Sequence, residues 1–528
     1  MKKTAIVLFV LGVIWGGILL WLKPYTGYMD ADYYYSLGRN LFLGRGFVDF
    51  QLWNYLSDPG GLPAPAAAYW MPAAAIFSWL GMLIAGSDSL LAARLPFVLL
   101  FALSSVAVAG VSFAIFKNRI YALTSGCLVL LSGYYLKFVT EPDGFALLFL
   151  CGAIIAYLIH QRSSLQPILL AVGLGIISGV IQMTRADGLI WFALCGLFLL
   201  FHLAALRRVG SDNSVMPLVR GLLVFAAGHL LVSGGWYLRN LHVYGSLFPP
   251  GGVGGLWLTR YEDLFLYPPQ QLNLAHWMSV GWAGIIFDRL KSLGLNLLSL
   301  VAVGGLLFLA PGIYAGVRHF PDRVQRIYWL TGLGAVLVMM SLVFPYAGSR
   351  GGFLHSLAII QPFLWIVAPS GLSHLVQGRQ TRQPRPGYSQ VQVCAGMIVI
   401  VTAASFFLVW NETRQPAAIT QANLWQEYRT VDQYLQKMGA PDGAGVMVAN
   451  PPAYYAATMR PAVMLPTGDP REIYPIGRLF EVQYVILDAN PAQAYQSLWN
   501  GLQEGSLPAQ PLGQAAGMQI FQFDAEEM

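Results

Sequence analysis

The stretch AIVLFVLGVIWGGILLWLKPYTGYMDADYYY, residues 5–35, joins an apolar run directly to an acidic motif. Residues 5–22 carry no charge and are long enough to cross the hydrocarbon core of a bilayer as a helix. Two lysines precede the run and no small-residue cleavage site follows it, so we expect an uncleaved first span with a cytoplasmic N-terminus. The acids Asp30 and Asp32 would then lie just outside the membrane.

The composition of the whole chain supports this reading. Of its 528 residues, 56% are hydrophobic and only 11% are charged. Soluble domains carry about 25% charged residues, so the composition excludes an assembly of soluble domains. The net charge of +6 comes from basic residues scattered between apolar runs. We therefore expect a lipid bilayer, and no nucleic acid, as the surroundings of this protein.

Further apolar runs of spanning length bring the expected number of spans to about eleven. They lie near residues 95–116, 118–138, 144–160, 165–183, 188–206, 221–238, 292–316, 327–346, 355–375 and 391–410. Lysine and arginine collect in the loops that this alternation assigns to the cytoplasm, as the positive-inside rule requires. The sequence thus predicts a multi-pass protein of the cell membrane with an extracytoplasmic C-terminus.

One apolar segment, 66–86 (AAAYWMPAAAIFSWLGMLIAG), does not fit the alternation. Counting it as a span would place Lys117 and Arg119 outside and invert every later loop. We therefore expect a helix on the outer face that lies in, or dips into, the bilayer surface. A true span, with another element miscounted, is the alternative.

The expected fold is mainly α, a polytopic bundle followed by a small α/β domain. The membrane module covers residues 1–410, with outer loops at 23–94 and 239–291. Residues 411–528 form the extracytoplasmic domain, long enough to bury a small core of its own. Its helix-like stretch lies at 420–438 and its short β-like runs at 446–448, 484–487 and 518–521.

Polar residues collect at the expected outer ends of the helices. They are Asp30 and Asp32, Glu141 and Asp143, Arg185 and Asp187, Arg239, and Arg350 with His355. If the helices form a bundle, these acids and arginines meet at one depth. The rigid fork of arginine suits the phosphate of a lipid-linked substrate, an aspartate could serve as general base, and close carboxylates could hold a divalent cation. For any one of these residues alone, an interfacial charge or a helix cap is the better explanation.

The acidic motif is followed by YYYSLGRNLFLGRGF (33–47), and several other stretches come in a matching order. They are AYWMP (68–72), RLPF (94–97), TEPD (140–143), TRADGL (184–189) and LRNLHVYGSLFPP (238–250). Together they resemble the GT-C membrane glycosyltransferases, in the branch of the protein O-mannosyltransferases and bacterial aminoarabinose transferases. The chain departs from that pattern at Ala31, where many members carry a second acid, and at Glu141, where an aspartate is commoner.

This resemblance implies inverting transfer of a sugar from a polyprenyl-phosphate donor to a protein, lipid or glycan acceptor on the extracytoplasmic face. It places Asp30 at the general base, with Asp32 and Glu141 as orienting groups or, together with Asp30, as ligands of a divalent cation. The resemblance leaves open whether a metal is bound. The expected substrate contacts are Tyr69, Asp143, Arg185, Asp187, Arg239, Arg350 and His355.

Two other functions compete with this one. A transporter or flippase for a lipid or a small anion would place polar groups near the midplane of the bilayer, where this sequence is almost free of charge. A non-catalytic subunit could keep a GT-C scaffold within a larger membrane complex. A chamber that brings together Asp30, the second acidic turn and an arginine would favour the enzyme.

Overall fold

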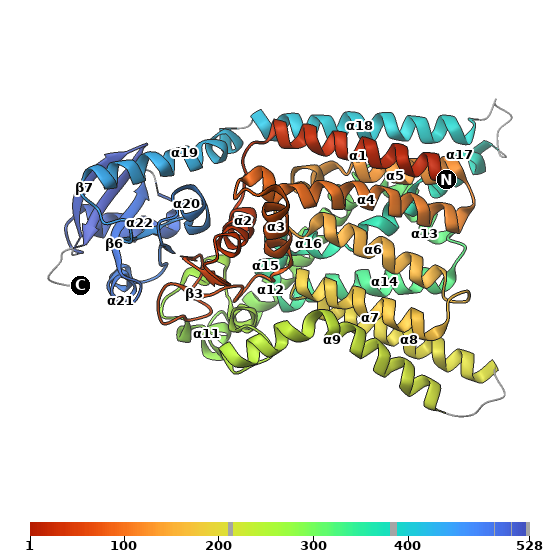
Figure 1. Ribbon diagram of the computed structural model, residues 1–528, viewed down its shortest axis with the longest axis horizontal. Coiled ribbons are helices and arrows are strands. Elements are labelled where there is room, and N and C mark those ends of the chain that lie inside the picture. The colour runs from red at the N-terminus through yellow and green to blue at the C-terminus, as the bar shows by residue number, and fades with distance from the viewer. Residues whose placement is uncertain (210–214, 381–387, 415, 490, 508, 524–528) are drawn as a thin grey trace.

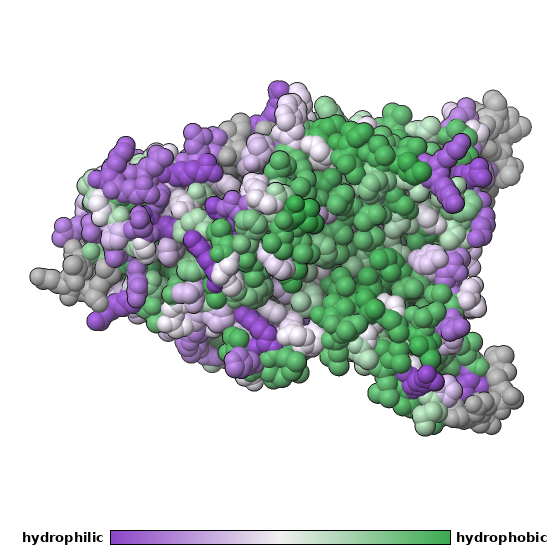
Figure 2. Space-filling view, in the orientation of Figure 1, coloured by the Kyte–Doolittle hydropathy of each residue, from purple (hydrophilic) through white to green (hydrophobic). Residues whose placement is uncertain are grey.

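The computed structural model describes residues 1–209, 215–380, 388–414, 416–489, 491–507 and 509–523. Its helices form a bundle, and the C-terminal residues form a smaller α/β unit at one end of that bundle (Figure 1). We call residues 416–523 the C-terminal α/β unit. Apolar side chains cover the side of the helical bundle, whereas hydrophilic residues gather over the α/β unit (Figure 2).

Seven helices among the described residues are long and apolar enough to cross a membrane. They are α1 (Lys2–Leu22), α4 (Leu90–Phe116), α7 (Pro167–Thr184), α8 (Gly188–Val209), α9 (Met216–Tyr244), α14 (Arg323–Val338), which a π-helical turn extends to Val343, and α18 (Gln390–Arg414). A bent pair, Pro345–Leu357 and Gln361–Gln377, passes the same test across a bend of 64°. The chain is therefore a multi-pass, mainly α-helical membrane protein.

Shorter helices complete the bundle and its loops. They are α2 (Met29–Phe42), α3 (Ala73–Ala85), α5 (Arg119–Leu130), α6 (Phe145–His160), α10 (Pro250–Gly254), α11 (Leu274–Met278), α12 (Gly281–Ser299), α13 (Ala310–Arg318), α15 (Pro345–Ala347), α16 (Phe353–Leu357) and α17 (Gln361–Gln380). In the first loop, β1 (Val48–Asp49) pairs with β3 (Ala64–Pro65).

Besides the run 355–375, which lies across the bend between Leu357 and Gln361, two expected spans, 118–138 and 292–316, are not continuous helices. Helix α5 ends at Leu130, and the second run is divided between α12 and α13. The two breaks meet in space, because a Cβ atom added at Gly133 would lie 2.3 Å from Leu306 Cδ2. Hydropathy alone does not reveal where two helices are interrupted side by side. The expectation of about eleven spans therefore included both runs as unbroken helices.

The proline-bounded segment 66–86 holds helix α3. This helix has 13 residues and ends at Gly86, whose φ of 62° is left-handed. A full crossing needs about 20 residues, so α3 is too short to span a bilayer by itself. It packs against α2 and α4 at the end of the bundle that faces the C-terminal α/β unit (Figure 1). Its length and place agree with the expected surface helix.

The C-terminal α/β unit is built on a six-stranded sheet in the order β2-β5-β4-β6-β8-β7. The expected strands are confirmed by β4 (Gly445–Val448), β6 (Val482–Asp488) and β8 (Met518–Phe523), to which β5 (Ala462–Met464) and β7 (Ala509–Ala515) are added. Strand β2 (Gln51–Leu52) belongs to the first loop and pairs with β5. The helices of the unit are α19 (Pro416–Lys437), α20 (Pro451–Thr458), α21 (Ile473–Leu479) and α22 (Gln496–Gln503).

Candidate active site

The first turn of α2 carries Asp30 and Asp32, where the N-terminal end of a helix favours negative charge. Residues two positions apart in a helix are separated by about 200° around its axis, so the side chains of Asp30 and Asp32 leave the helix in nearly opposite directions. Asp30 comes close to Asp143 and His355. Asp32 instead accepts hydrogen bonds from the Thr26 hydroxyl and the Trp425 indole nitrogen.

Asp30, Asp143 and His355 form one group, which we call the Asp30 cluster. Each offers one ligand atom, and these atoms all lie within 4.8 Å of one another. Asp143 Oδ2 accepts a hydrogen bond from the Tyr28 hydroxyl at 2.9 Å and lies 3.1 Å from His355 Nε2. The other imidazole nitrogen, Nδ1, lies 3.1 Å from the carbonyl oxygen of Gly351. These contacts fix the orientation of the imidazole and the Asp143 carboxylate.

The two carboxyl groups of the cluster have opposite electrostatic surroundings. Burial, reinforced by the nearby Asp143 charge, raises the pKa of Asp30 to about 6. Burial would also raise the pKa of Asp143, but His355, the Gly144 amide and Tyr28 together hold it below the usual range. Asp143 is thus held in its ionised form, and Asp30 is a better proton acceptor than an ordinary aspartate.

Arg185 lies beside this cluster, and its charge lowers the pKa of Asp30. Its Nε atom donates to Asp187 Oδ1 at 2.7 Å, and a terminal nitrogen reaches the Ser356 hydroxyl at 3.3 Å. The Ser356 hydroxyl in turn donates to Asp187. Arg185 and Asp187 therefore hold each other in a fixed geometry at the wall of the site.

Glu141 belongs to a second group, which we call the Glu141 cluster, with Arg94 and Lys23. The Glu141 side chain is fully buried at 0% exposure, and its Oε1 lies 2.6 Å from an Arg94 nitrogen and 3.3 Å from Lys23 Nζ. Arg94 also donates to the carbonyl oxygens of Lys23 and Thr140. This cluster ties the end of α1 to α4 and to the turn before α6.

The sequence-based set of base and metal ligands, Asp30 with Asp32 and Glu141, is therefore not brought together. Asp32 and Glu141 both turn to other partners, and burial raises the pKa of each carboxyl group, in Asp32 to about 7. Asp143 and His355, which the sequence indicated as substrate contacts, take their places beside Asp30. The sequence did place all five residues in the polar motifs at the outer ends of the helices. It did not show toward which partner each side chain points.

Tyr69 and Arg239 lie in different surroundings. The Asp30 charge and burial raise the pKa of Tyr69 to about 12, with burial the larger cause. The Tyr69 ring packs edge-on against Trp53 with centroids 4.9 Å apart. The Arg239 guanidinium donates to the carbonyl oxygen of Ala66 at 2.8 Å and lies over the rings of Phe47, Trp236 and Tyr244. Tyr69 thus borders the Asp30 cluster, while Arg239 is engaged with the first loop.

Arg350 lies at a separate polar cavity of about 330 Å³. Its side chain is 62% exposed, with the guanidinium 4.9 Å from the Tyr261 ring and 3.5 Å from Glu262. The cavity is further lined by Arg260, Asp288, Lys291, Tyr346 and Ser349. Tyr261 also lines this cavity, and burial, with the Asp30 charge as a smaller cause, raises the pKa of its hydroxyl.

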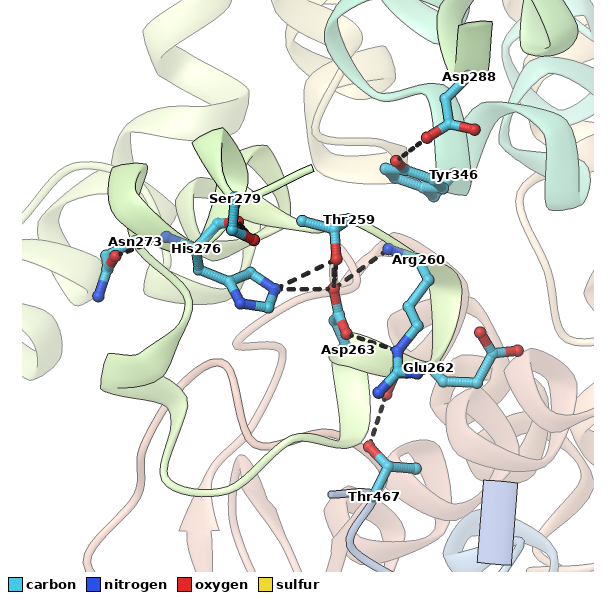
Figure 3. A network of polar contacts seen from close by, with 10 residues as sticks. All are labelled: Thr259, Arg260, Glu262, Asp263, Asn273, His276, Ser279, Asp288, Tyr346 and Thr467. Atoms are coloured by element: carbon cyan, nitrogen blue, oxygen red, sulfur yellow. Dashed lines mark hydrogen bonds and ion pairs between the residues drawn. The ribbon is translucent and has the colours of Figure 1, made fainter. Parts of the chain in front are cut away.

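A buried aspartate organises the loop beside this cavity (Figure 3). Asp263 Oδ2 accepts hydrogen bonds from the backbone N–H and the hydroxyl of Thr259, both at 2.8 Å, and lies 3.2 Å from His276 Nε2. Its Oδ1 accepts from Arg260 Nε at 3.1 Å. These contacts fold residues 259–276 around one carboxylate and hold Arg260 at the cavity wall.

The comparisons with known proteins agree with the architecture. ArnT from Cupriavidus metallidurans matches in its apo state with a TM-score of 0.55 and bound to undecaprenyl phosphate with a TM-score of 0.53, each at 13% identity over 99% of this chain and 98% of that chain. An oligosaccharyltransferase from Archaeoglobus fulgidus, in complex with Zn and sulfate, matches with a TM-score of 0.51 at 14% identity, over 90% of this chain and 68% of that chain. No family model and no curated protein matches the chain. Both structural neighbours are GT-C glycosyltransferases, and what they share with this chain is the fold.

Proposed function

We propose that this chain, which has the fold of the GT-C membrane glycosyltransferases, moves a sugar from a polyprenyl-phosphate donor to an acceptor on the extracytoplasmic face of the cell membrane. The observation that carries this proposal is the Asp30 cluster, with Arg185 at its side. The N-terminus is then cytoplasmic, and the acceptor is a protein, a lipid or a glycan.

Asp30 acts as the general base in this reaction. The acceptor hydroxyl or amide passes its proton to the Asp30 carboxylate while its oxygen or nitrogen forms a bond to the anomeric carbon. The bond from that carbon to the phosphate oxygen breaks on the opposite face, and the electron pair leaves with the polyprenyl phosphate. The anomeric configuration is inverted. Because phosphate leaves readily, no acid partner is needed, unlike in a glycosidase.

The other polar residues serve binding and orientation. Arg185 meets the negative charge that grows on the leaving phosphate, and its ion pair with Asp187 keeps the guanidinium in place. Arg350, whose side chain is mostly exposed at the separate polar cavity, offers a second contact for the phosphate. Tyr69 borders the sugar. Arg239 supports the first loop, because its guanidinium is engaged by the Ala66 carbonyl oxygen.

The Asp30 cluster also fits a divalent cation, because it gathers two carboxylates and one imidazole whose ligand atoms lie within 4.8 Å of one another. Asp30, Asp143 and His355 would hold the cation. When bound, it would supply positive charge that stabilises the donor phosphate. A structural neighbour was solved in complex with Zn and sulfate, which supports a metal site in this fold.

The test is transfer activity in the full-length protein held in lipid nanodiscs. Mass spectrometry of the lipids that copurify identifies the donor, and sugar transfer from that donor is measured for the wild type and for Asp30→Asn. Removing a general base should lower the turnover number by about 10³-fold. The matched control is Asp88→Asn, because Asp88 forms a partly exposed ion pair with Arg39, and its loss should change turnover less than about twofold.

Two outcomes would overturn the proposal. Asp30→Asn with wild-type transfer would remove the base. Uptake of a lipid or small anion into proteoliposomes that survives Asp30→Asn, in the absence of any transfer, would favour a transporter instead.

A further inference from the structure

Asp32 is the acid nearest to Asp30 in sequence, but its side chain serves a different contact. It is 3% exposed, and its Oδ1 atom accepts hydrogen bonds from Thr26 in the loop after α1 and from Trp425 Nε1, the latter at 2.9 Å. Trp425 lies on α19 of the C-terminal α/β unit. A single carboxylate oxygen thus joins the end of the first span, the first turn of α2 and the distant C-terminal unit.

The ring of Trp425 strengthens this contact. It stacks on Tyr35 with centroids 5.6 Å apart and an interplanar angle of 27°. Tyr35 lies one turn after Asp32 on α2, so the indole covers the face of the helix that points away from the Asp30 cluster. The hydrogen bond and the stacking contact fix the helix in rotation as well as in position.

A second contact holds the other end of α2. The Tyr455 hydroxyl of α20 donates to Asn40 Oδ1, and Arg45 donates to the same hydroxyl at 3.0 Å. The ring of Tyr455 also stacks on Phe50, directly before strand β2. Helix α2 is therefore clamped to the C-terminal α/β unit at both ends, and strand β2 continues that attachment into the sheet.

We propose that Asp32 and Trp425 are positioning residues, through which the C-terminal α/β unit sets the place of Asp30 relative to Asp143 and Arg185. This inference rests on the proposed function, since Asp30 is the group being placed. Neither residue touches the reacting atoms. The role differs from that of a base or metal ligand, because it depends on the hydrogen bond and not on the charge of Asp32.

The experiment compares variants that separate these roles. Trp425→Phe removes the N–H donor and keeps an aromatic ring against Tyr35, so the turnover number should fall by about tenfold with the donor KM within about twofold of the wild type. The matched control is Trp499→Phe, which changes a tryptophan of the same α/β unit on α22. Asp32→Asn keeps the oxygen that accepts both bonds, so its turnover should fall severalfold less than that of Asp32→Ala.

Hydrogen exchange in nanodiscs provides a second measurement that needs no substrate. Trp425→Phe should raise the exchange of the amides between Thr26 and Tyr34, and Trp499→Phe should not. Equal turnover and equal exchange in Trp425→Phe and the wild type would overturn the inference. Equal losses in Asp32→Asn and Asp32→Ala would also overturn it, because charge would then matter more than the bond.

The failures of the two proposals can be told apart. If Asp30→Asn abolishes transfer while Trp425→Phe changes neither turnover nor exchange, only the positioning role is wrong. If Asp30→Asn transfers sugar at the wild-type rate, the proposed function itself fails.

Discussion

Two acid pairs, Asp30 with Asp32 and Glu141 with Asp143, have the same spacing in sequence, and the fold divides both in the same way. One member of each pair, Asp30 or Asp143, enters the Asp30 cluster. The other member is buried among structural partners, Asp32 on Trp425 and Thr26 and Glu141 on Arg94 and Lys23. Two acidic motifs thus each contribute one residue to the Asp30 cluster and one to contacts that hold the surrounding helices.

The two clusters differ in how their negative charge is balanced. The Glu141 cluster sets two cationic side chains against one carboxylate, with Arg94 only 2% exposed. The Asp30 cluster sets two carboxylates against one imidazole, with Arg185 already paired to Asp187. A buried charge without a partner is costly, so the first arrangement is stable by itself. The second is poised to take up a proton or a cationic ligand.

A substitution that breaks the Glu141 cluster should have the largest effect on the stability of the fold. Arg94→Met removes the closer of the two cationic partners of the buried Glu141 carboxylate and leaves only Lys23 Nζ, 3.3 Å away, to balance its charge, which costs up to about 3–5 kcal/mol. The melting temperature of the detergent-solubilised protein should therefore fall steeply. The double variant Arg94→Met/Glu141→Gln carries no such charge and should recover part of the loss. A melting temperature of Arg94→Met equal to that of the wild type would show that the cluster does not support the fold.

A substitution in the Asp30 cluster should lower the turnover number and leave the stability of the fold nearly unchanged. Asp143→Asn removes the anion that orients His355 and balances the site, and we expect the turnover number to fall by about 10²-fold. The same variant should weaken binding of Mn²⁺, measured by electron paramagnetic resonance on the full-length protein. Its melting temperature should stay within a few degrees of the wild type. A large loss of stability with unchanged turnover per folded molecule would reverse the roles assigned to Asp143 and Glu141.

Hydropathy and motif order were sufficient for much of this architecture. They predicted the multi-pass bundle, an outer-face helix within residues 66–86, where α3 lies, and three strands of the C-terminal sheet. They also placed the polar residues at one end of the helices. These features depend on local composition, which a sequence displays directly.

The partners toward which individual acidic side chains point could not be predicted in the same way. Asp32 turns to Trp425, 393 residues away in the chain, and Glu141 turns to Arg94, 47 residues away. Such partners are chosen by tertiary packing. The same is true of Arg239, which the sequence indicated as a phosphate contact and whose guanidinium is engaged by the Ala66 carbonyl oxygen and three aromatic rings.

The last expected effect, which shows only in the pH dependence of stability, concerns Asp49, another buried acid. Its Oδ2 atom accepts a hydrogen bond from the Tyr33 hydroxyl at 2.7 Å, and burial raises its pKa to about 7. In the unfolded chain the pKa of an aspartate is about 3.9, so the folded state holds a proton that the unfolded state has released. Stability should therefore fall as pH rises from about 4 to about 7, by at most about 1.4 kcal/mol per pH unit, and level off above.

Asp49→Asn removes this titration, because the amide stays neutral and its oxygen can still accept the bond from Tyr33. The melting temperature of Asp49→Asn, relative to the wild type, should accordingly rise between pH 5 and pH 7. The matched variant is Asp469→Asn, since the Asp469 carboxylate pairs with Arg471 at the surface and its pKa is lowered to about 2 by hydrogen bonds from Arg471. Equal pH profiles in Asp49→Asn and the wild type would mean that Asp49 is ionised in the folded protein. Its charge would then be compensated by Arg239, the cationic group that already lowers its pKa, and the first loop would be held by an ion pair in the manner of the Glu141 cluster.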